Sequence, residues 1–189
     1  YDSGEGKKVW LSQRETDTLL SEADGTEQRI ALALGARCGL RSAEVVDVAP
    51  QDIVGTGAGR MLRVWDGKGS KYRETPIPPN LATTIETVGD VRDESEDAPV
   101  VDVSTRTLRR WVSSVAEKRK EATGDRGWSF LGFHDLRRSW ATSLRSADVD
   151  AMVVCDWGGW DDLETFLDHY RGTATPEAQL REREKVGWL

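Results

Sequence analysis

The hydrophobic pattern changes period part-way along the chain. Before Pro50 and after Asn80, apolar residues recur every three or four positions, which is typical of helices that bury one face. Between them, Gln51–Val54, Met61–Trp65 and Arg73–Pro78 are short and strand-like, and Gly-rich turn sequences separate them. We therefore expect a mainly α fold with a small antiparallel β-sheet, an α+β arrangement.

Capping and breaking residues divide the helical parts. Ser12 and Glu15 have the spacing of a capping box, and Thr175-Pro176-Glu177 is a strong helix start. Asp90–Asp97 and Gly124–Gly132 are expected to be loops. The helices are expected at residues 13–23, 27–38, 80–88 and 150–157, from Arg41 to before Pro50, from Ser104 or Thr105 to before Gly124, from Phe133 onward, from Asp161 to about Tyr170, and after Pro176.

Length and composition indicate one soluble globular domain, residues 10–189, after a polar lead-in at residues 1–9. The 189 residues can bury a real core, and no apolar run approaches the ~20 residues that cross a membrane. No secretory leader is evident, and Cys38 and Cys155 form no CxxC pair. We expect a cytoplasmic protein with reduced thiols, no membrane partner and no structural zinc.

The charge balance is acidic and rich in arginine. Lys+Arg total 26 against 33 Asp+Glu, a net charge of -7, and 19 of the 26 basic residues are arginine. This composition resembles proteins of salt-loving microbes, although an ordinary acidic protein is the alternative. At ~1 M salt the Debye length is only ~3 Å, so net charge alone does not exclude a nucleic-acid partner.

The segment from Phe133 to Trp140 combines proton transfer with anion binding. His134 and Arg137 are three positions apart at the start of an expected helix, so they share a face. Histidine exchanges a proton near neutral pH, and the guanidinium fork suits phosphate oxygens. Arg138 is turned about 100° from Arg137 and is expected to be structural or to contact a nucleic-acid backbone.

Other parts of the chain supply what a phosphoryl-transfer site needs. Arg41, with Glu44 three positions on, offers a second guanidinium, and Lys68 lies in the Gly-flanked hairpin as a proton donor. Tyr170 offers a hydroxyl nucleophile and Trp160 an indole N–H. This chemistry needs no metal and no cofactor, so we expect neither.

These segments together resemble the catalytic domain of the tyrosine recombinases, the phage integrase family. The similarity covers Cys38–Glu44, Gly67–Pro78, Phe133–Thr142, Gly158–Trp160 and His169–Arg171, in family order. Each motif alone is weak, but the ordered set spans most of the chain. With the acidic composition, the resemblance suggests a halophilic archaeon or its virus as the source.

The resemblance implies a site-specific recombinase or integrase acting on double-stranded DNA through a 3′-phosphotyrosyl intermediate. It assigns the tyrosine nucleophile, two phosphate-binding arginines, a lysine acid, an assisting histidine and a phosphate-contacting tryptophan. It also implies a homo-tetramer on DNA, no small-molecule substrate, and an amino-terminal DNA-clamping domain that this chain lacks. The assigned residues are Tyr170, Arg41, Arg137, Lys68, His134 and Trp160.

Several alternatives stay open. Trp160 is followed by Tyr170 ten positions later, one more than the family usually has, and one extra residue turns a helix by ~100°. That spacing favours a non-catalytic DNA-binding relative, while a type IB topoisomerase shares the chemistry. Lys71 is a weaker candidate for the acid, and Tyr170 or Trp160 could simply be core aromatics.

Overall fold

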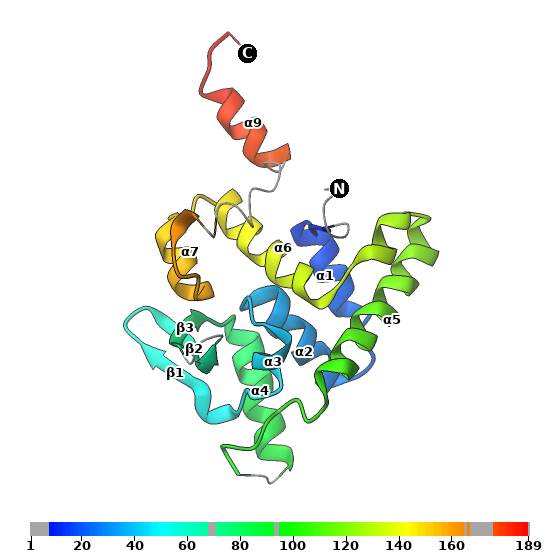
Figure 1. Cartoon of the computed structure of the whole chain (residues 1–189), viewed down its shortest axis with the longest axis vertical. Coiled ribbons are helices and arrows are strands. Elements are labelled where there is room, and N and C mark those ends of the chain that lie inside the picture. The colour runs from blue at the N-terminus through cyan, green and yellow to red at the C-terminus, as the bar shows by residue number, and fades with distance from the viewer. Residues whose placement is uncertain (1–7, 68–70, 93–94, 165, 167–175, 189) are drawn as a thin grey trace.

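A computed structural model shows a mainly helical chain with one small sheet, which confirms the expected class (Figure 1). The structure describes residues 8–67, 71–92, 95–164, 166 and 176–188. None of the helices in these ranges is long and apolar enough to cross a membrane.

Helix α2 (Thr26–Arg37) is the buried centre of the fold. Its residues from Ile30 to Ala36 are buried, and it contacts α1 (Gln13–Ser21), α3 (Ser42–Val45), α4 (Pro79–Arg92), α5 (Thr105–Thr123) and α6 (Phe133–Ser146) (Figure 1). An apolar surface on nearly all sides suits a helix surrounded by others. The capping box predicted for α1 is present, since the Ser12 hydroxyl accepts from the Glu15 N–H and the Glu15 carboxylate accepts from the Ser12 N–H.

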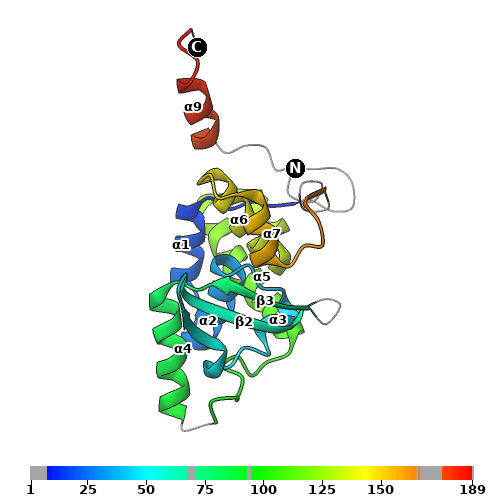
Figure 2. The same ribbon diagram turned by 90° about the vertical axis from the view of Figure 1, so that its left-hand side faces the viewer.

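Three antiparallel strands form the sheet in the order β1 (Ile53–Thr56), β2 (Gly59–Gly67), β3 (Lys71–Pro76). The short helix η1 (Pro50–Asp52) leads into it. Leu62 lies opposite Thr75 in the β2–β3 pair, and the register shifts between Val64 and Gly67. Strand β3 also contacts α7 (Ala151–Gly158), which lies beside the sheet (Figure 2).

Two expected loops are partly helical. Helix α4 continues past Val88 to Arg92, because Gly89 packs against Pro50 and the Arg92 side chain donates to the Val100 carbonyl. The loop at Gly124–Gly132 contains the 3₁₀ helix η2 (Arg126–Phe130), since the Asp125 carboxylate accepts from a first-turn N–H and the Trp128 side chain is buried.

The C-terminal elements lie against and beyond α6. Helix α7 begins at its Asp150 cap and ends with Gly159 in the left-handed region. Helix α9 (Pro176–Glu184) follows at the end of the molecule, where Arg181 donates to the Ser146 carbonyl and pairs with Asp148 (Figure 1). The expected helix from Asp161 to about Tyr170 lies partly outside the described residues.

The buried side chains form two clusters. The larger cluster surrounds α2 and includes Phe133 and Leu136 of α6. The smaller one contains Trp140 of the same helix together with Val154 and Phe166. Helix α6 therefore belongs to both clusters. Cys38 and Cys155 are buried free thiols.

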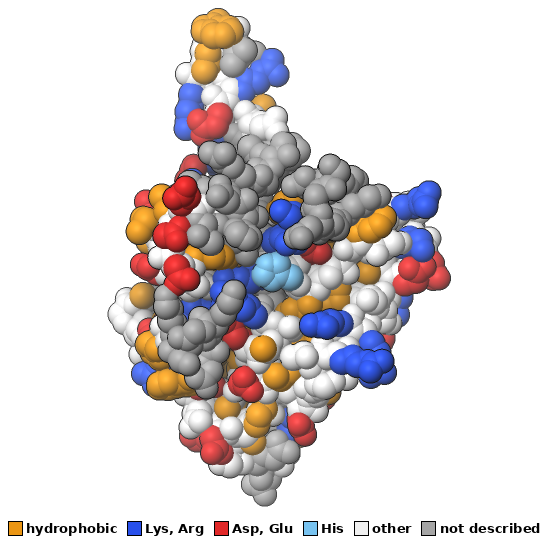
Figure 3. Space-filling view, in the orientation of Figure 1, with side chains coloured by type: hydrophobic (Ala, Val, Ile, Leu, Met, Phe, Trp, Pro, Cys, Tyr) orange, Lys and Arg blue, Asp and Glu red, His pale blue; other side chains and the backbone are white. Residues whose placement is uncertain are grey.

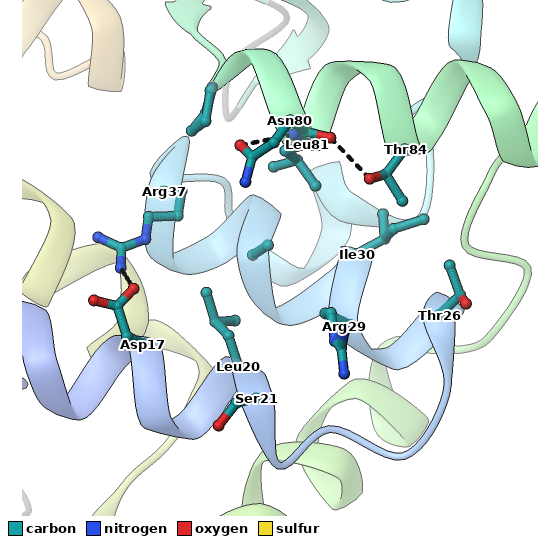
Figure 4. A pocket seen from close by; sticks show the side chains of 12 residues that line it. Asp17, Leu20, Ser21, Thr26, Arg29, Ile30, Arg37, Asn80, Leu81 and Thr84 are labelled. Atoms are coloured by element: carbon teal, nitrogen blue, oxygen red, sulfur yellow. Dashed lines mark hydrogen bonds and ion pairs between the residues drawn. The ribbon is translucent and has the colours of Figure 1, made fainter.

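A hollow of about 330 Å³ lies between α1, α2 and α4 (Figure 4). Its floor is apolar, with Leu20, Ile30 and Leu81, and Arg37 pairs with Asp17 at the rim. None of the candidate site residues predicted from the sequence lines this hollow.

Candidate active site

Four separate segments meet at the predicted site. They are the α2–α3 junction, strand β3, the first turn of α6 and the end of α7. Side chains and carbonyls from all four are joined by a continuous set of hydrogen bonds and ion pairs.

Arg41 is the N-cap residue of α3 and is held there by Glu44. The Arg41 N–H donates to one Glu44 oxygen at 2.7 Å, and its Nη1 donates to the other at 2.7 Å. Its Nη2 lies 3.4 Å from the Gly159 carbonyl, and the side chain is 25% exposed. The guanidinium is thus anchored on one side and open to solvent on the other.

Glu44 is shared between two arginines. Arg73 on β3 donates Nη1 to one Glu44 oxygen at 2.9 Å and Nη2 to the other at 2.7 Å. Burial raises the pKa of Glu44, but the hydrogen bonds and charges of Arg73 and Arg41 outweigh burial and lower it to about 2. Glu44 is therefore a carboxylate at neutral pH.

Arg73 is the functional candidate that the sequence prediction missed. It is buried, its Nε donates to the Trp157 carbonyl at 3.1 Å, and its Cδ lies against Gly159. A signal was present: Arg73 and Thr75 alternate with Tyr72 and Glu74, and inward-facing charges on a strand demand a partner.

Arg137 lies almost entirely inside the protein, at 1% exposure. One Nη donates to the Gly39 carbonyl and the other to the Gly158 carbonyl at 2.6 Å. Gly39 has φ +69° and a Cβ there would lie 2.3 Å from the Trp140 ring, so glycine is required. Arg137 thus ties the α2–α3 junction to the end of α7.

Trp160 packs beneath Arg137. The Arg137 guanidinium carbon lies 4.2 Å from the centre of the Trp160 ring, a cation–π distance. The ring also stacks on Trp140, at 6.2 Å between centroids, and touches Phe166 at 4.8 Å. These contacts are those of a packed aromatic side chain. The phosphate contact of Trp160 stays a prediction.

His134 stands at the surface in the first turn of α6, among cations. Partial desolvation, followed by the positive charges of Arg138 and Arg137, lowers the pKa of His134 to about 4. The side chain is nevertheless exposed, and water screens part of this repulsion. His134 is therefore a neutral base near pH 7. Arg138 pairs with Asp135 within the helix.

Arg41 and His134 line one hollow of about 620 Å³. Arg109 and Ser113 of α5 line it as well. Basic side chains gather around the histidine on this face (Figure 3). Two predicted site residues, Lys68 and Tyr170, lie outside the described residues, so the structure places neither. Within the described ranges, no group of three His, Cys, Asp or Glu residues is arranged to hold a metal ion.

The described geometry is a cluster of arginines and one histidine built on an α+β helical core. Residues 9–176 match the phage integrase family. The chain belongs to that family.

Relatives with similar sequences are recombinases from archaea and bacteria. Tyrosine recombinase XerA of Thermococcus kodakarensis is 30% identical over 181 residues, covering 93% of this chain and 62% of the relative. XerA of Pyrococcus furiosus is 27% identical with the same coverage, and a putative integrase/recombinase of Sinorhizobium fredii is 28% identical over 90% of this chain and 54% of the relative. The chain therefore spans less than two thirds of these relatives.

Solved structures share the fold at lower identity. The XerA recombinase crystal structure has a TM-score of 0.71 at 22% identity and covers 94% of this chain and 64% of that one. The XerH recombinase bound to difH substrate has a TM-score of 0.70 at 18% identity, covering 98% and 56%. The catalytic domain of bacteriophage HP1 integrase has a TM-score of 0.63 at 16% identity and covers 97% of both chains.

Proposed function

We propose that residues 10–189 form the catalytic domain of a site-specific DNA recombinase or integrase. The observation that carries this proposal is that Arg41 and Arg137, from segments almost 100 residues apart, donate to neighbouring carbonyls at Gly158 and Gly159, while His134 lines one hollow with Arg41. Two guanidiniums and a neutral imidazole suit a phosphodiester that gains negative charge as it reacts.

In the proposed reaction, the Tyr170 hydroxyl oxygen attacks the scissile phosphorus. Its proton passes to His134, whose imidazole is neutral near pH 7 because desolvation and then the nearby arginines lower its pKa. Arg41 faces the non-bridging oxygens and stabilises their charge. Arg137, which the Gly39 and Gly158 carbonyls hold inside the protein, adds its positive charge from there, aided by Trp160. The bond to the 5′ oxygen breaks, and Lys68 supplies the proton that this oxygen takes up.

The product is a 3′-phosphotyrosyl link and a free 5′-hydroxyl. A 5′-hydroxyl from a second strand attacks the same phosphorus, which releases Tyr170 and joins the strands. Bond energy is kept in the covalent link, so the cycle needs no nucleotide cofactor and no metal.

The proposed partner is double-stranded DNA, and the proposed assembly is a homo-tetramer on it. The XerH structure in complex with difH substrate supports DNA as the ligand of this fold. Helix α9 is the proposed segment for exchange between protomers. Acidic, arginine-rich composition supports an origin in a halophilic archaeon or its virus. The free thiols of Cys38 and Cys155 support a cytoplasmic location.

Covalent capture tests the nucleophile directly. The chain is incubated with a library of nicked duplexes of random sequence, denatured in detergent, and the DNA attached to protein is sequenced. We expect a recurring sequence attached through a 3′ phosphate, and no capture with Tyr170→Phe. Tyr72→Phe is the matched control and retains capture.

Other outcomes separate the alternatives. Capture that persists in Tyr170→Phe means that the nucleophile is misassigned. Sequence-selective binding without a covalent product favours a non-catalytic relative. Relaxation of supercoiled plasmid without a preferred sequence favours a type IB topoisomerase.

A further inference from the structure

Arg73 lies within the Gly67–Pro78 segment, but the sequence motifs assign it no role. Its two Nη atoms grip both oxygens of Glu44, at 2.9 and 2.7 Å, and its Nε reaches the Trp157 carbonyl. One side chain on β3 therefore contacts the segment that carries Arg41 and the end of the helix that supplies the Arg137 acceptor. The contact with Glu44 is buried, and the one with Trp157 is partly buried.

The contacts of Glu44 with its two arginines differ in kind. Arg73 binds in the bidentate fork geometry, whereas the Arg41 side chain donates to a single carboxylate oxygen. Bidentate pairs are the stronger and the better oriented of the two. Arg73 is also the more buried partner, with 6% of its side chain exposed against 25% for Arg41. Glu44 is therefore mainly the counter-ion of Arg73.

We propose that Arg73 is a positioning residue that keeps Arg41 available to an incoming phosphate. Two guanidiniums share one carboxylate, so the cluster retains one positive charge, and that charge lies at the solvent-facing arginine. This inference rests on the proposed function, because it takes Arg41 to be a phosphate ligand.

The consequence of losing Arg73 follows from the geometry. Buried Glu44 would keep only Arg41 as a cationic partner, and a buried carboxylate draws its remaining partner into the tightest available pairing. Arg41 would then turn both Nη atoms toward Glu44 and away from the hollow. Arg63 lines a hollow together with Glu44, Asp47 and Asp52, but its guanidinium already pairs with Glu74 at 3.7 Å, so it does not replace Arg73.

Phosphate binding to Arg41 provides a test that needs no DNA. At 21.0 kDa the chain suits NMR, and inorganic phosphate is titrated while the Arg41 Nε–H signal is followed. Arg41→Lys assigns that signal. In Arg73→Met we expect the dissociation constant for phosphate to rise at least ~10-fold, because phosphate loses a charge-assisted contact with Arg41.

A second substitution separates positioning from simple anchoring of β3. In Arg73→Met/Glu44→Gln the buried charge that captures Arg41 is gone, so phosphate binding should recover toward the wild-type value. If Arg73 only anchors the strand, the double variant stays as weak as Arg73→Met, and the proposal is overturned. Unchanged binding in Arg73→Met overturns it too.

Arg60→Met is the matched control, because Arg60 lies on the neighbouring strand β2 and pairs with Glu86 of α4 rather than with Glu44. It should leave phosphate binding unchanged. Thermal melts of each variant set a temperature at which all are folded.

The rate of covalent capture on the duplex selected from the random library is the second readout. It should fall in Arg73→Met and recover in the double variant. Phosphate results as expected, together with no covalent complex from the wild type, support Arg73 positioning and count against the transferase itself. The two proposals can therefore fail separately.

Discussion

Among the residues of the site, Glu44 depends most on its neighbours, because it is a buried carboxylate. A carboxylate with 3% exposure is stabilised only while both arginines bind it. We expect Glu44→Gln to lower the free energy of unfolding by about 3 kcal/mol at pH 7, because Arg73 is left buried without a counter-ion. Chemical denaturation measures this difference.

The contribution of Glu44 to the free energy of unfolding should depend on pH. The pKa of Glu44 is about 2 in the folded protein against an ordinary value of 4.5, so its stabilisation is complete above 4.5 and is lost as pH falls toward 2. The deficit of Glu44→Gln should therefore shrink over that range. Glu121→Gln, at an exposed position of α5, is the control and should match the wild type throughout. A deficit that does not change with pH contradicts the ion-pair account.

His134 should titrate below an ordinary histidine. Desolvation and the nearby arginines lower its pKa to about 4, and screening at the exposed ring keeps the measured value between that and 6.5. An NMR titration of the ring carbons checks this, with His134→Gln identifying its signals, since the chain has only two histidines.

The protonation of His134 also affects the free energy of unfolding at low pH. The unfolded chain binds a proton on His134 at a higher pH than the folded chain does, so its effect is absent above 6.5 and destabilises the fold as pH drops toward 4. A folded-state pKa above 6.5 would mean that anionic groups, not arginines, dominate the ring's surroundings.

Among the elements, the end of α7 tolerates the least change. A Cβ at Gly158 would lie 1.8 Å from the Trp160 ring, and the Gly158 carbonyl accepts from Arg137. Gly158→Ala should therefore displace Trp160 and cost at least ~2 kcal/mol of stability, in the range of overpacked cores. Covalent capture should fall with it.

The control for this element is Gly57→Ala. Gly57 lies in an exposed turn between β1 and β2, where a Cβ meets nothing within 4 Å. Its melting temperature should stay within a degree or two of the wild type, at about the usual size of surface effects. Equal losses at the two glycines would show that backbone conformation, rather than contact with Trp160, sets the cost.

Element type was predictable because periodicity and caps are local. Ser12 with Glu15, Asp150 and Ser104 each begin a helix as the sequence predicts. Boundaries that depend on distant contacts were not predictable: α4 reaches Arg92 through a bond to the Val100 carbonyl.

The site shows the same division. Motif order nominated Arg41, His134 and Arg137, and the fold brings these three together. The role of Arg73 was missed because it depends on its pairing with Glu44, which only the fold brings next to it. Lys68 and Tyr170 stay predictions.

The whole molecule carries a net charge of -7 while its candidate site is basic. Self-repulsion among the surface acids weakens with salt, as the Debye length falls from ~10 Å at 0.1 M to ~3 Å at 1 M. We expect the melting temperature to rise with KCl up to at least ~1 M, as scanning calorimetry would measure. A plateau near ~0.2 M would favour the ordinary acidic protein over the salt-adapted one.

The division of the buried side chains into two clusters has a consequence for motion. Leu40, next to Arg41, and Phe133 at the start of α6 belong to the larger cluster, whereas Val154 of α7 belongs to the smaller one and Trp160 packs against it. Small cooperative units open at a lower free energy than large ones. Transient opening of α7 would release one Arg137 acceptor and the Trp160 ring while the α2 core stays closed. The lifetime of the assembled site is thus set by the smaller cluster, and amide exchange should be faster in α7 than in α2.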